Sequence, residues 1–116
     1  MGQYHKWWSP ALGQDMELKV YGHAGKPVLV FPSGGGRFYE YEDFGMVEAC
    51  KPFLNSGRIR LFTVDSVDYQ SWYNRSAPAA DRVRRHEQYE RYVLHEVVPF
   101  IRQVSGPQPL MTTGCS

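Results

Sequence analysis

The sequence predicts an α/β fold, in which a mostly parallel sheet is covered by helices and carries an antiparallel hairpin at its N-terminal edge. Short apolar runs that are rich in β-branched residues alternate along the chain with longer stretches of helical periodicity. Nearly continuous apolar runs are typical of strands buried on both faces. Strands that alternate with helices are joined by right-handed crossovers into a parallel sheet.

Two strands are expected to open the chain as a hairpin. Residues 4–9 are rich in aromatic side chains, and residues 12–15 have the composition of a turn. In residues 16–21, apolar side chains alternate with Glu and Lys, which is the pattern of a half-buried strand. We therefore place this hairpin at an edge of the sheet.

A strand–helix–strand unit follows. Residues 27–31 form a continuous apolar run and predict a buried strand. The pattern predicts one helix over residues 41–54, with acidic residues in its first turn and a Gly-containing stop at residues 55–57. Residues 60–64 predict the next strand, which ends at Asp65.

The second half of the chain predicts a long helix and a short strand. After a loop over residues 65–80, Asp81 is the expected N-cap of a helix that reaches about Ser105. Pro99 is expected to kink this helix. Residues 109–113 then predict another strand, directly before Gly114-Cys115-Ser116.

Composition excludes several classes of protein. The 116 residues carry a net charge of +1, which excludes the basic character of a protein that binds nucleic acid or an anionic membrane. With 42% hydrophobic and 15% aromatic residues, the chain is not disordered. No signal-peptide or membrane-spanning pattern is present, so we expect a soluble cytoplasmic protein. We expect no cofactor and no metal, because the four His show no metal-ligand spacing.

Three loops leave the carboxyl ends of the predicted parallel strands. They cover residues 33–39, 65–73 and 114–116, and sites in open α/β sheets lie at this edge. The Gly-x-Ser tripeptide at residues 114–116 is common by chance, but here it directly follows a predicted strand. That is the position of a nucleophile elbow, in which Ser116 would be the nucleophile.

The glycines that follow residues 27–31 suit the second part of such a site, the backbone groups that bind the oxyanion. In acyl transfer the developing oxyanion is stabilised by backbone N–H groups, one of which comes from a glycine-rich loop. Gly35 or Gly36 is the expected donor. A flexible turn or a phosphate cradle remains the alternative, although no Gly-Lys-Ser/Thr follows, as a Walker-type loop requires.

These motifs together resemble one esterase family of the α/β-hydrolase fold, the group that includes esterase D and the antigen 85 mycolyltransferases. The resemblance rests on the stretch from Phe31 to Asp43, on Val64-Asp65-Ser66 with Ser71-Trp72-Tyr73, on the long helix, and on Thr113-Gly114-Cys115-Ser116. It implies a three-layer α/β/α domain. It also implies that Ser116 matches the family's nucleophile and that Gly35 or Gly36 matches its oxyanion position.

The chain departs from that family after Ser116. A family member continues with further strands, an acid and a catalytic His, in the order Ser, acid, His. Here all four His residues precede Ser116. We therefore expect residues 1–116 to be the N-terminal half of one hydrolase domain and to be inactive alone. A second chain that carries the C-terminal half is the expected partner, and it would cover the strand edge left at residues 110–113.

Other candidate residues have two interpretations each. Trp72 and Tyr73 either line a substrate pocket or pack over the sheet edge. Arg37 either contacts a polar group of the substrate or forms a structural ion pair, and the ion pair is the favoured reading. One of the two tryptophans at residues 7–8 is a candidate contact in a homo-oligomer.

The predicted function is that of a serine hydrolase of the carboxylesterase type, acting on a small-molecule ester. A non-catalytic binding protein with the same fold is the alternative. A thioesterase, an acyltransferase or a peptidase on this fold also remains open.

Overall fold

The computed structural model describes residues 2–114, so Cys115 and Ser116 lie outside the described residues. Five strands form one mixed sheet in the order β1-β2-β4-β3-β5. The strands are β1 (Gln3–Ser9), β2 (Gln14–Tyr21), β3 (Lys26–Phe31), β4 (Ile59–Val64) and β5 (Met111–Gly114). β1 and β2 form the predicted antiparallel hairpin at one edge, and β3 is parallel to both β4 and β5. The predicted α/β fold with a mixed sheet is thus confirmed.

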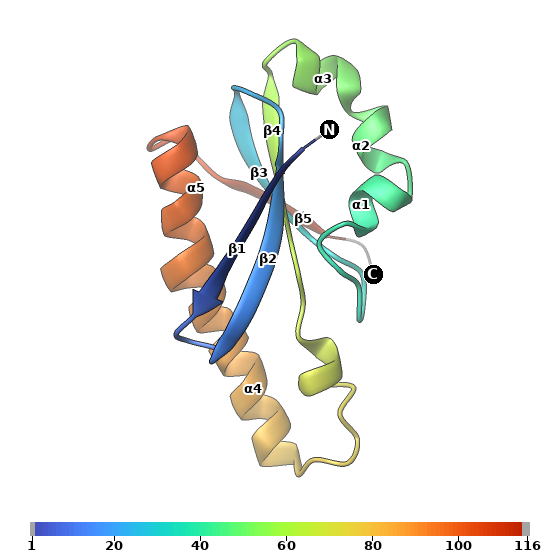
Figure 1. Cartoon of the computed structure of the whole chain (residues 1–116), viewed down its shortest axis with the longest axis vertical. Helices are drawn as coiled ribbons and strands as arrows, with labels where there is room; N and C mark the ends of the chain where they lie inside the picture. Colours follow the sequence, from blue (N-terminus) through green and yellow to red (C-terminus); the bar gives the residue numbers. More distant parts are fainter. Residues whose placement is uncertain (1, 115–116) are drawn as a thin grey trace.

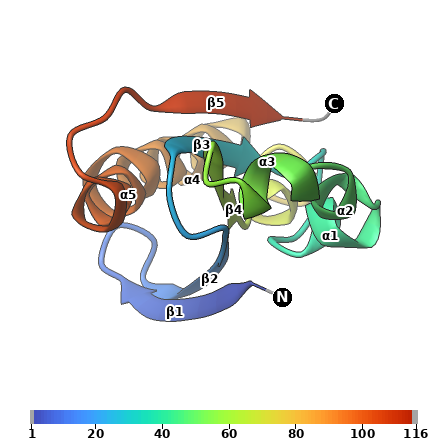
Figure 2. The same ribbon diagram turned by 90° about the horizontal axis from the view of Figure 1, so that it is seen from above.

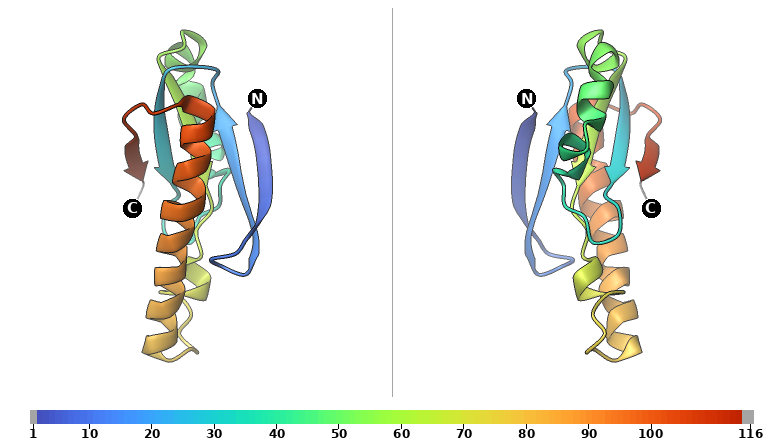
Figure 3. Two further views of the ribbon diagram at one scale, coloured as in Figure 1. Left: turned by 90° about the vertical axis from the view of Figure 1, so that its left-hand side faces the viewer. Right: turned by 90° about the vertical axis from the view of Figure 1, so that its right-hand side faces the viewer.

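Helices cover both faces of the sheet, as Figures 1 and 2 show. One face carries the rod formed by α4 (Ala79–Tyr92), the π-helical segment η2 (Val93–Val97) and α5 (Val98–Ser105). The short helices α1 (Glu40–Asp43), α2 (Met46–Ala49) and α3 (Lys51–Asn55) lie on the other face. The two side views in Figure 3 show these helix groups in front of opposite sides of the strands.

The core therefore has two parts, one on each side of the sheet. In β3, Leu29 faces the long helical rod, whereas Val28 and Val30 face α2 and α3. β4 divides its side chains in the same way. This confirms that these apolar runs are strands buried on both faces, and it explains why they do not alternate with polar residues.

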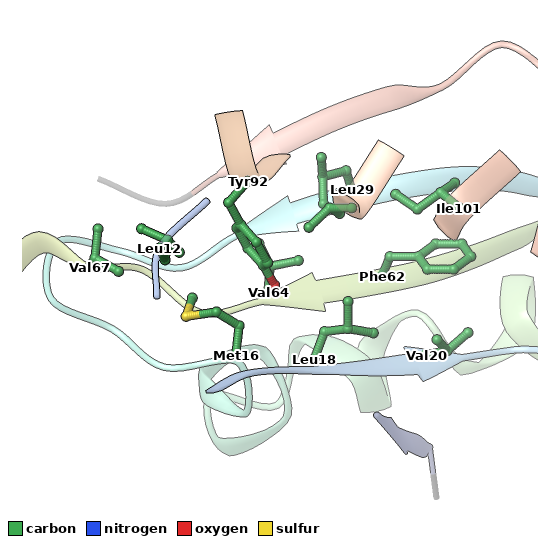
Figure 4. Packing of buried hydrophobic residues seen from close by; sticks show 11 residues of the cluster. Leu12, Met16, Leu18, Val20, Leu29, Phe62, Val64, Val67, Tyr92 and Ile101 are labelled. Atoms are coloured by element: carbon green, nitrogen blue, oxygen red, sulfur yellow. The ribbon is translucent and has the colours of Figure 1, made fainter. Parts of the chain in front are cut away.

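The larger part of the core lies between the sheet and the long rod (Figure 4). Tyr92 and Ile101 of the rod pack against Leu18, Leu29 and Phe62 of three neighbouring strands. Each of these five side chains is at most 1% exposed. Burial of such a side chain stabilises the fold by about 1.5–3 kcal/mol, so this contact holds the rod across the sheet.

The predicted single helix over residues 41–54 is wrong. The segment forms three short helices, because Gly45 has a φ of +77° and separates α1 from α2. Pro52 lies in the first turn of α3, where its missing N–H costs no hydrogen bond. The acidic residues and apolar side chains of this segment fit a helix, but the two helix-breaking residues decide its shape.

One detail of the long helix also differs from prediction. The helix begins at Ala79 behind Pro78, and Asp81 lies in its first turn rather than at the N-cap, where it accepts a hydrogen bond from Arg84. Pro99 follows the π-helical segment η2, and the helical rod continues through it to Ser105. Directly before Pro99, the Val98 N–H donates to the Val93 carbonyl, which is the i to i−5 bond of a π turn. A kink at Pro99 stays a prediction.

Candidate active site

The parallel pairing of β3 with β4 and β5 brings the carboxyl ends of these three strands to the same edge of the sheet. β3 and β5 pair in parallel, with Phe31 opposite Gly114. The loop that begins after Phe31 therefore leaves the sheet beside the point where β5 ends. β5 itself forms the other edge of the five strands, and all four of its residues are exposed.

The glycine loop, residues 33–36, is a tight turn. The Gly36 N–H donates to the Ser33 carbonyl at 2.7 Å, and Gly35 has a φ of +72°. The Glu40 carboxylate accepts hydrogen bonds from both the N–H (2.6 Å) and the hydroxyl of Ser33. The Ser66 hydroxyl donates to the Gly36 carbonyl at 3.1 Å. Side chains from two other segments thus fix the loop at both ends.

Asp68 reaches the centre of the glycine loop from η1 (Asp68–Gln70). Its Oδ2 accepts a hydrogen bond from the Gly35 N–H at 2.9 Å. The N–H groups of Gly35 and Gly36, the predicted oxyanion donors, therefore already have acceptors within the protein. Their role stays a prediction, and a substrate oxygen would have to replace Asp68 or the Ser33 carbonyl to use them.

Two tyrosine side chains pack against the glycine loop. A Cβ placed on Gly34 would lie 2.1 Å from the Tyr73 hydroxyl oxygen, and one on Gly35 would lie 2.8 Å from the Tyr69 ring. The two rings contact each other edge to face, with centroids 5.5 Å apart. A side chain at either position would have to push a tyrosine aside, and at Gly35 it would also need a left-handed backbone.

Replacing Gly35 by alanine is expected to lower the free energy of unfolding by at least about 2 kcal/mol. A left-handed backbone costs an L-residue roughly 1–2 kcal/mol, and the new methyl group also meets Tyr69. Gly13→Ala is the matched control, because Gly13 has a similar φ of +66° and nothing within 4 Å of a built Cβ. Urea unfolding checks the difference, and equal losses in the two variants would contradict the close contact.

Arg37 forms structural ion pairs, which is the interpretation that the sequence favours. Its Nε donates to Asp65 at 2.9 Å, and a terminal nitrogen donates to Glu17 at 2.8 Å. Asp65 is 6% exposed and also accepts the Phe38 N–H at 2.8 Å. These contacts tie the glycine loop to the end of β4 and to β2. Contact between Arg37 and a substrate stays a prediction.

Burial raises the pKa of Asp65 above its ordinary value, while the Arg37 guanidinium and the Phe38 N–H offset part of the rise. The folded state therefore holds a proton at Asp65 more readily than the unfolded chain does. Stability contributed by this group falls as the pH rises from about 4 through the raised pKa. We expect the free energy of unfolding of the unmodified protein, minus that of Asp65→Asn, to decrease over this window. A difference that stays flat from pH 4 to 7 would contradict the buried carboxylate.

Trp72 lies beside the long rod rather than inside a closed pocket. Its ring packs on His86 with centroids 5.0 Å apart, and it is 47% exposed. His86 also borders an open apolar cavity of about 390 Å³, together with Phe31 and Leu94. A second, polar cavity of about 260 Å³ is lined by Gly35, Gly36 and Arg37. Binding of a substrate by Trp72 or Tyr73 stays a prediction.

The described residues contain neither a metal-binding cluster nor a membrane-spanning helix. Across residues 2–114, no three His, Cys, Asp or Glu side chains gather closely enough to hold a metal ion. In the same part of the chain, no helix has both the length and the apolar character needed to span a membrane.

Comparison with known proteins places this fold among esterases. No protein-family model matches the chain, and no curated protein matches it. Among solved structures, it is similar to S-formylglutathione hydrolase from Staphylococcus aureus, with a TM-score of 0.67 and 14% identity over 98% of this chain and 47% of that one. A CE1 ferulic acid esterase from Anaeromyces mucronatus gives a TM-score of 0.72 at 8% identity, over 100% of this chain and 49% of that one.

A third similar structure is the enterobactin esterase of Shigella flexneri, with a TM-score of 0.57 and 10% identity over 96% of this chain and 27% of that one. The chain has the α/β fold of these esterases. It spans about half of the length of the first two enzymes and about a quarter of the third. At these identities the likeness shows the fold alone.

Sequence reasoning missed the residues that hold the glycine loop. The sequence placed Glu40 directly before a predicted helix. It gave no site role to Asp68 or Tyr69, which lie in the predicted loop over residues 65–80. Their contacts join segments 7 to 33 residues apart, as the Ser33–Glu40 and Gly35–Asp68 hydrogen bonds show. The one available signal was that acidic and aromatic residues follow two strands whose ends meet at one edge.

Proposed function

We propose that this chain supplies the nucleophile and the oxyanion loop of a serine hydrolase that acts on small carboxylic esters. The observation that carries this proposal is the parallel pairing of β3 and β5, with Phe31 opposite Gly114. The pairing supports a site in which the glycine loop faces Ser116, which follows Gly114 by two residues. The fold shared with several esterases adds support.

In this proposal Ser116 attacks the ester carbonyl carbon, and the carbonyl oxygen becomes an oxyanion. An N–H of Gly35 or Gly36 stabilises that charge, together with the N–H of the residue that follows the serine. For Gly35 this requires the substrate oxygen to replace the Asp68 carboxylate. Arg37, Trp72 and Tyr73 border the substrate. No cofactor takes part.

The base and the acid of the triad come from a second polypeptide in this proposal. A serine without a neighbouring imidazole is a weak nucleophile at neutral pH, and this chain spans only about half of the length of two of the similar esterases. The partner would carry the C-terminal half of the same domain and pair with the exposed edge of β5. Trp8, which is 62% exposed on the edge strand β1, is the proposed contact if the assembled protein forms a homo-oligomer.

One observation favours a second candidate, a non-catalytic binding protein with this fold. The N–H groups of Gly35 and Gly36 both have acceptors inside the protein. A protein that has no oxyanion to bind would keep these hydrogen bonds permanently. Reactivity of Ser116 separates the two candidates.

Labelling with a fluorophosphonate tests the proposal. The protein is isolated from its natural host through an N-terminal tag, labelled, and mapped by peptide mass spectrometry. We expect the label on Ser116, no label in Ser116→Ala, and none on residues 1–116 produced alone. An unlabelled Ser116 in the isolated protein would exclude the hydrolase. Full labelling of a sample whose only species is 13.4 kDa would exclude the second polypeptide.

A further inference from the structure

The Tyr73 hydroxyl points end-on at the glycine loop. From a Cβ built on Gly34, the hydroxyl oxygen lies at 2.1 Å, the ring carbon that bears it at 3.2 Å, and the next ring carbon at 3.7 Å. Tyr69 approaches Gly35 differently, since two ring carbons and its oxygen all lie 2.8–3.0 Å from the built Cβ. Tyr69 thus packs through the edge of its ring, whereas Tyr73 presents its polar end.

Tyr73 is held in this position by its own backbone and by its neighbour. Its N–H donates to the Asp68 carbonyl at 2.7 Å, and its ring contacts Tyr69 at 67° between the ring planes. The side chain is half exposed. A residue that served only to fill space against Gly34 would not need an oxygen at the point of contact.

The hydroxyl is a donor that is still open. Within residues 2–114, neither the Tyr73 O–H nor the Gly34 N–H has a hydrogen-bond partner, whereas the N–H groups of Gly35 and Gly36 do. The Tyr73 hydroxyl contacts the loop at Gly34, one residue before Gly35, whose N–H donates to Asp68. A substrate oxygen bound to these two open donors would break no hydrogen bond among the described residues.

We propose that the Tyr73 hydroxyl is a catalytic residue that donates a hydrogen bond to the oxyanion; this inference rests on the proposed function. As Ser116 Oγ bonds to the carbonyl carbon, its proton passes to the imidazole of the second polypeptide. The π electrons of the carbonyl move onto its oxygen, which the Tyr73 O–H then stabilises without giving up its proton. When the carbonyl re-forms, the C–O bond to the alcohol breaks, and the alcohol leaves with the proton from the imidazole.

Tyr73→Phe tests this role in the protein as isolated from its host, with p-nitrophenyl acetate as the probe. Removing one oxyanion donor lowers kcat by roughly 100-fold or more, and KM should stay within about twofold because the charge develops only in the transition state. Tyr69→Phe is the matched control and should leave kcat within about twofold. Urea unfolding of both variants checks that they are equally stable.

A double substitution makes the test sharper. Gly34→Ala should lower kcat because its methyl group pushes the Tyr73 hydroxyl away from the loop. In a Tyr73→Phe background the same change should then add little, so the two losses would not be additive.

The outcomes separate this inference from the proposed function. If the unmodified protein neither hydrolyses the ester nor takes the phosphonate label, both are wrong. If it hydrolyses the ester and Tyr73→Phe does so within about twofold as fast, only the role of Tyr73 is overturned. Equal losses in Tyr73→Phe and Tyr69→Phe would also overturn it, because they would show a general disturbance of the loop.

Discussion

Replacing Ser116 by alanine is expected to lower kcat for ester hydrolysis on the order of 10⁴-fold or more. The reason is that no other group of the proposed site can form the acyl-enzyme, so only binding and oxyanion stabilisation would remain. The measurement is the hydrolysis of p-nitrophenyl acetate by the protein isolated from its natural host.

Ser56→Ala serves as the control for this prediction. Ser56 is exposed at the end of α3, and within residues 2–114 its hydroxyl bonds only to the Phe53 carbonyl. This variant should retain full activity. If Ser116→Ala kept more than about a tenth of the activity, Ser116 would not be the nucleophile.

The largest effect on stability is expected at Glu96. Its carboxylate accepts hydrogen bonds from the Trp7 indole at 2.9 Å, the Ser9 hydroxyl at 2.8 Å and the Ala11 N–H at 3.2 Å. These three donors belong to the N-terminal hairpin, and Ser9 is fully buried. Glu96 therefore joins that hairpin to the π-helical segment of the long rod.

Glu96→Ala should lower the free energy of unfolding by about 3 kcal/mol, because buried donors that lose their acceptor cost about 1–3 kcal/mol each. Glu96→Gln should lose less, since its amide keeps one acceptor oxygen. Glu87→Ala, on the exposed side of α4, is the control and should stay within about 0.5 kcal/mol. Urea unfolding decides, and a loss below 1 kcal/mol in Glu96→Ala would contradict a structural role for these contacts.

The strands could be predicted because their signal is local. The apolar runs that became β3 and β4 are continuous, and continuity alone indicates burial on both faces. The alternation in β2 likewise placed Met16 and Leu18 on one side. Parallel pairing then followed from the order of strands and helices, which fixes the sheet edge where the loops meet.

The broken helix over residues 41–54 shows where local patterns fail. Acidic residues at the start of this segment and apolar side chains along it favour a helix. Gly45, however, takes a left-handed conformation, and Pro52 lies in the first turn of a separate helix, α3. Whether a glycine interrupts a helix depends on the packing around it, because its own preference is weak.

Long-range polar contacts could not be predicted from the sequence, for a different reason. Arg85 lies in a charged stretch of α4 and donates to the Leu12 carbonyl and to the side chains of Gln14, Gln70 and Gln88. Asp68 on the Gly35 N–H is a second example. Such contacts depend on which loops lie side by side in the fold, and the periodicity of apolar residues in the sequence does not indicate this.

The most direct test of the proposed site is a crystal structure of the protein after it reacts with a fluorophosphonate. We expect the phosphorus on Ser116 Oγ and a phosphonyl oxygen about 2.7–3.1 Å from a donor of the glycine loop or from the Tyr73 hydroxyl. A phosphonyl oxygen that faces solvent, with the glycine loop still closed by Asp68, would contradict the account.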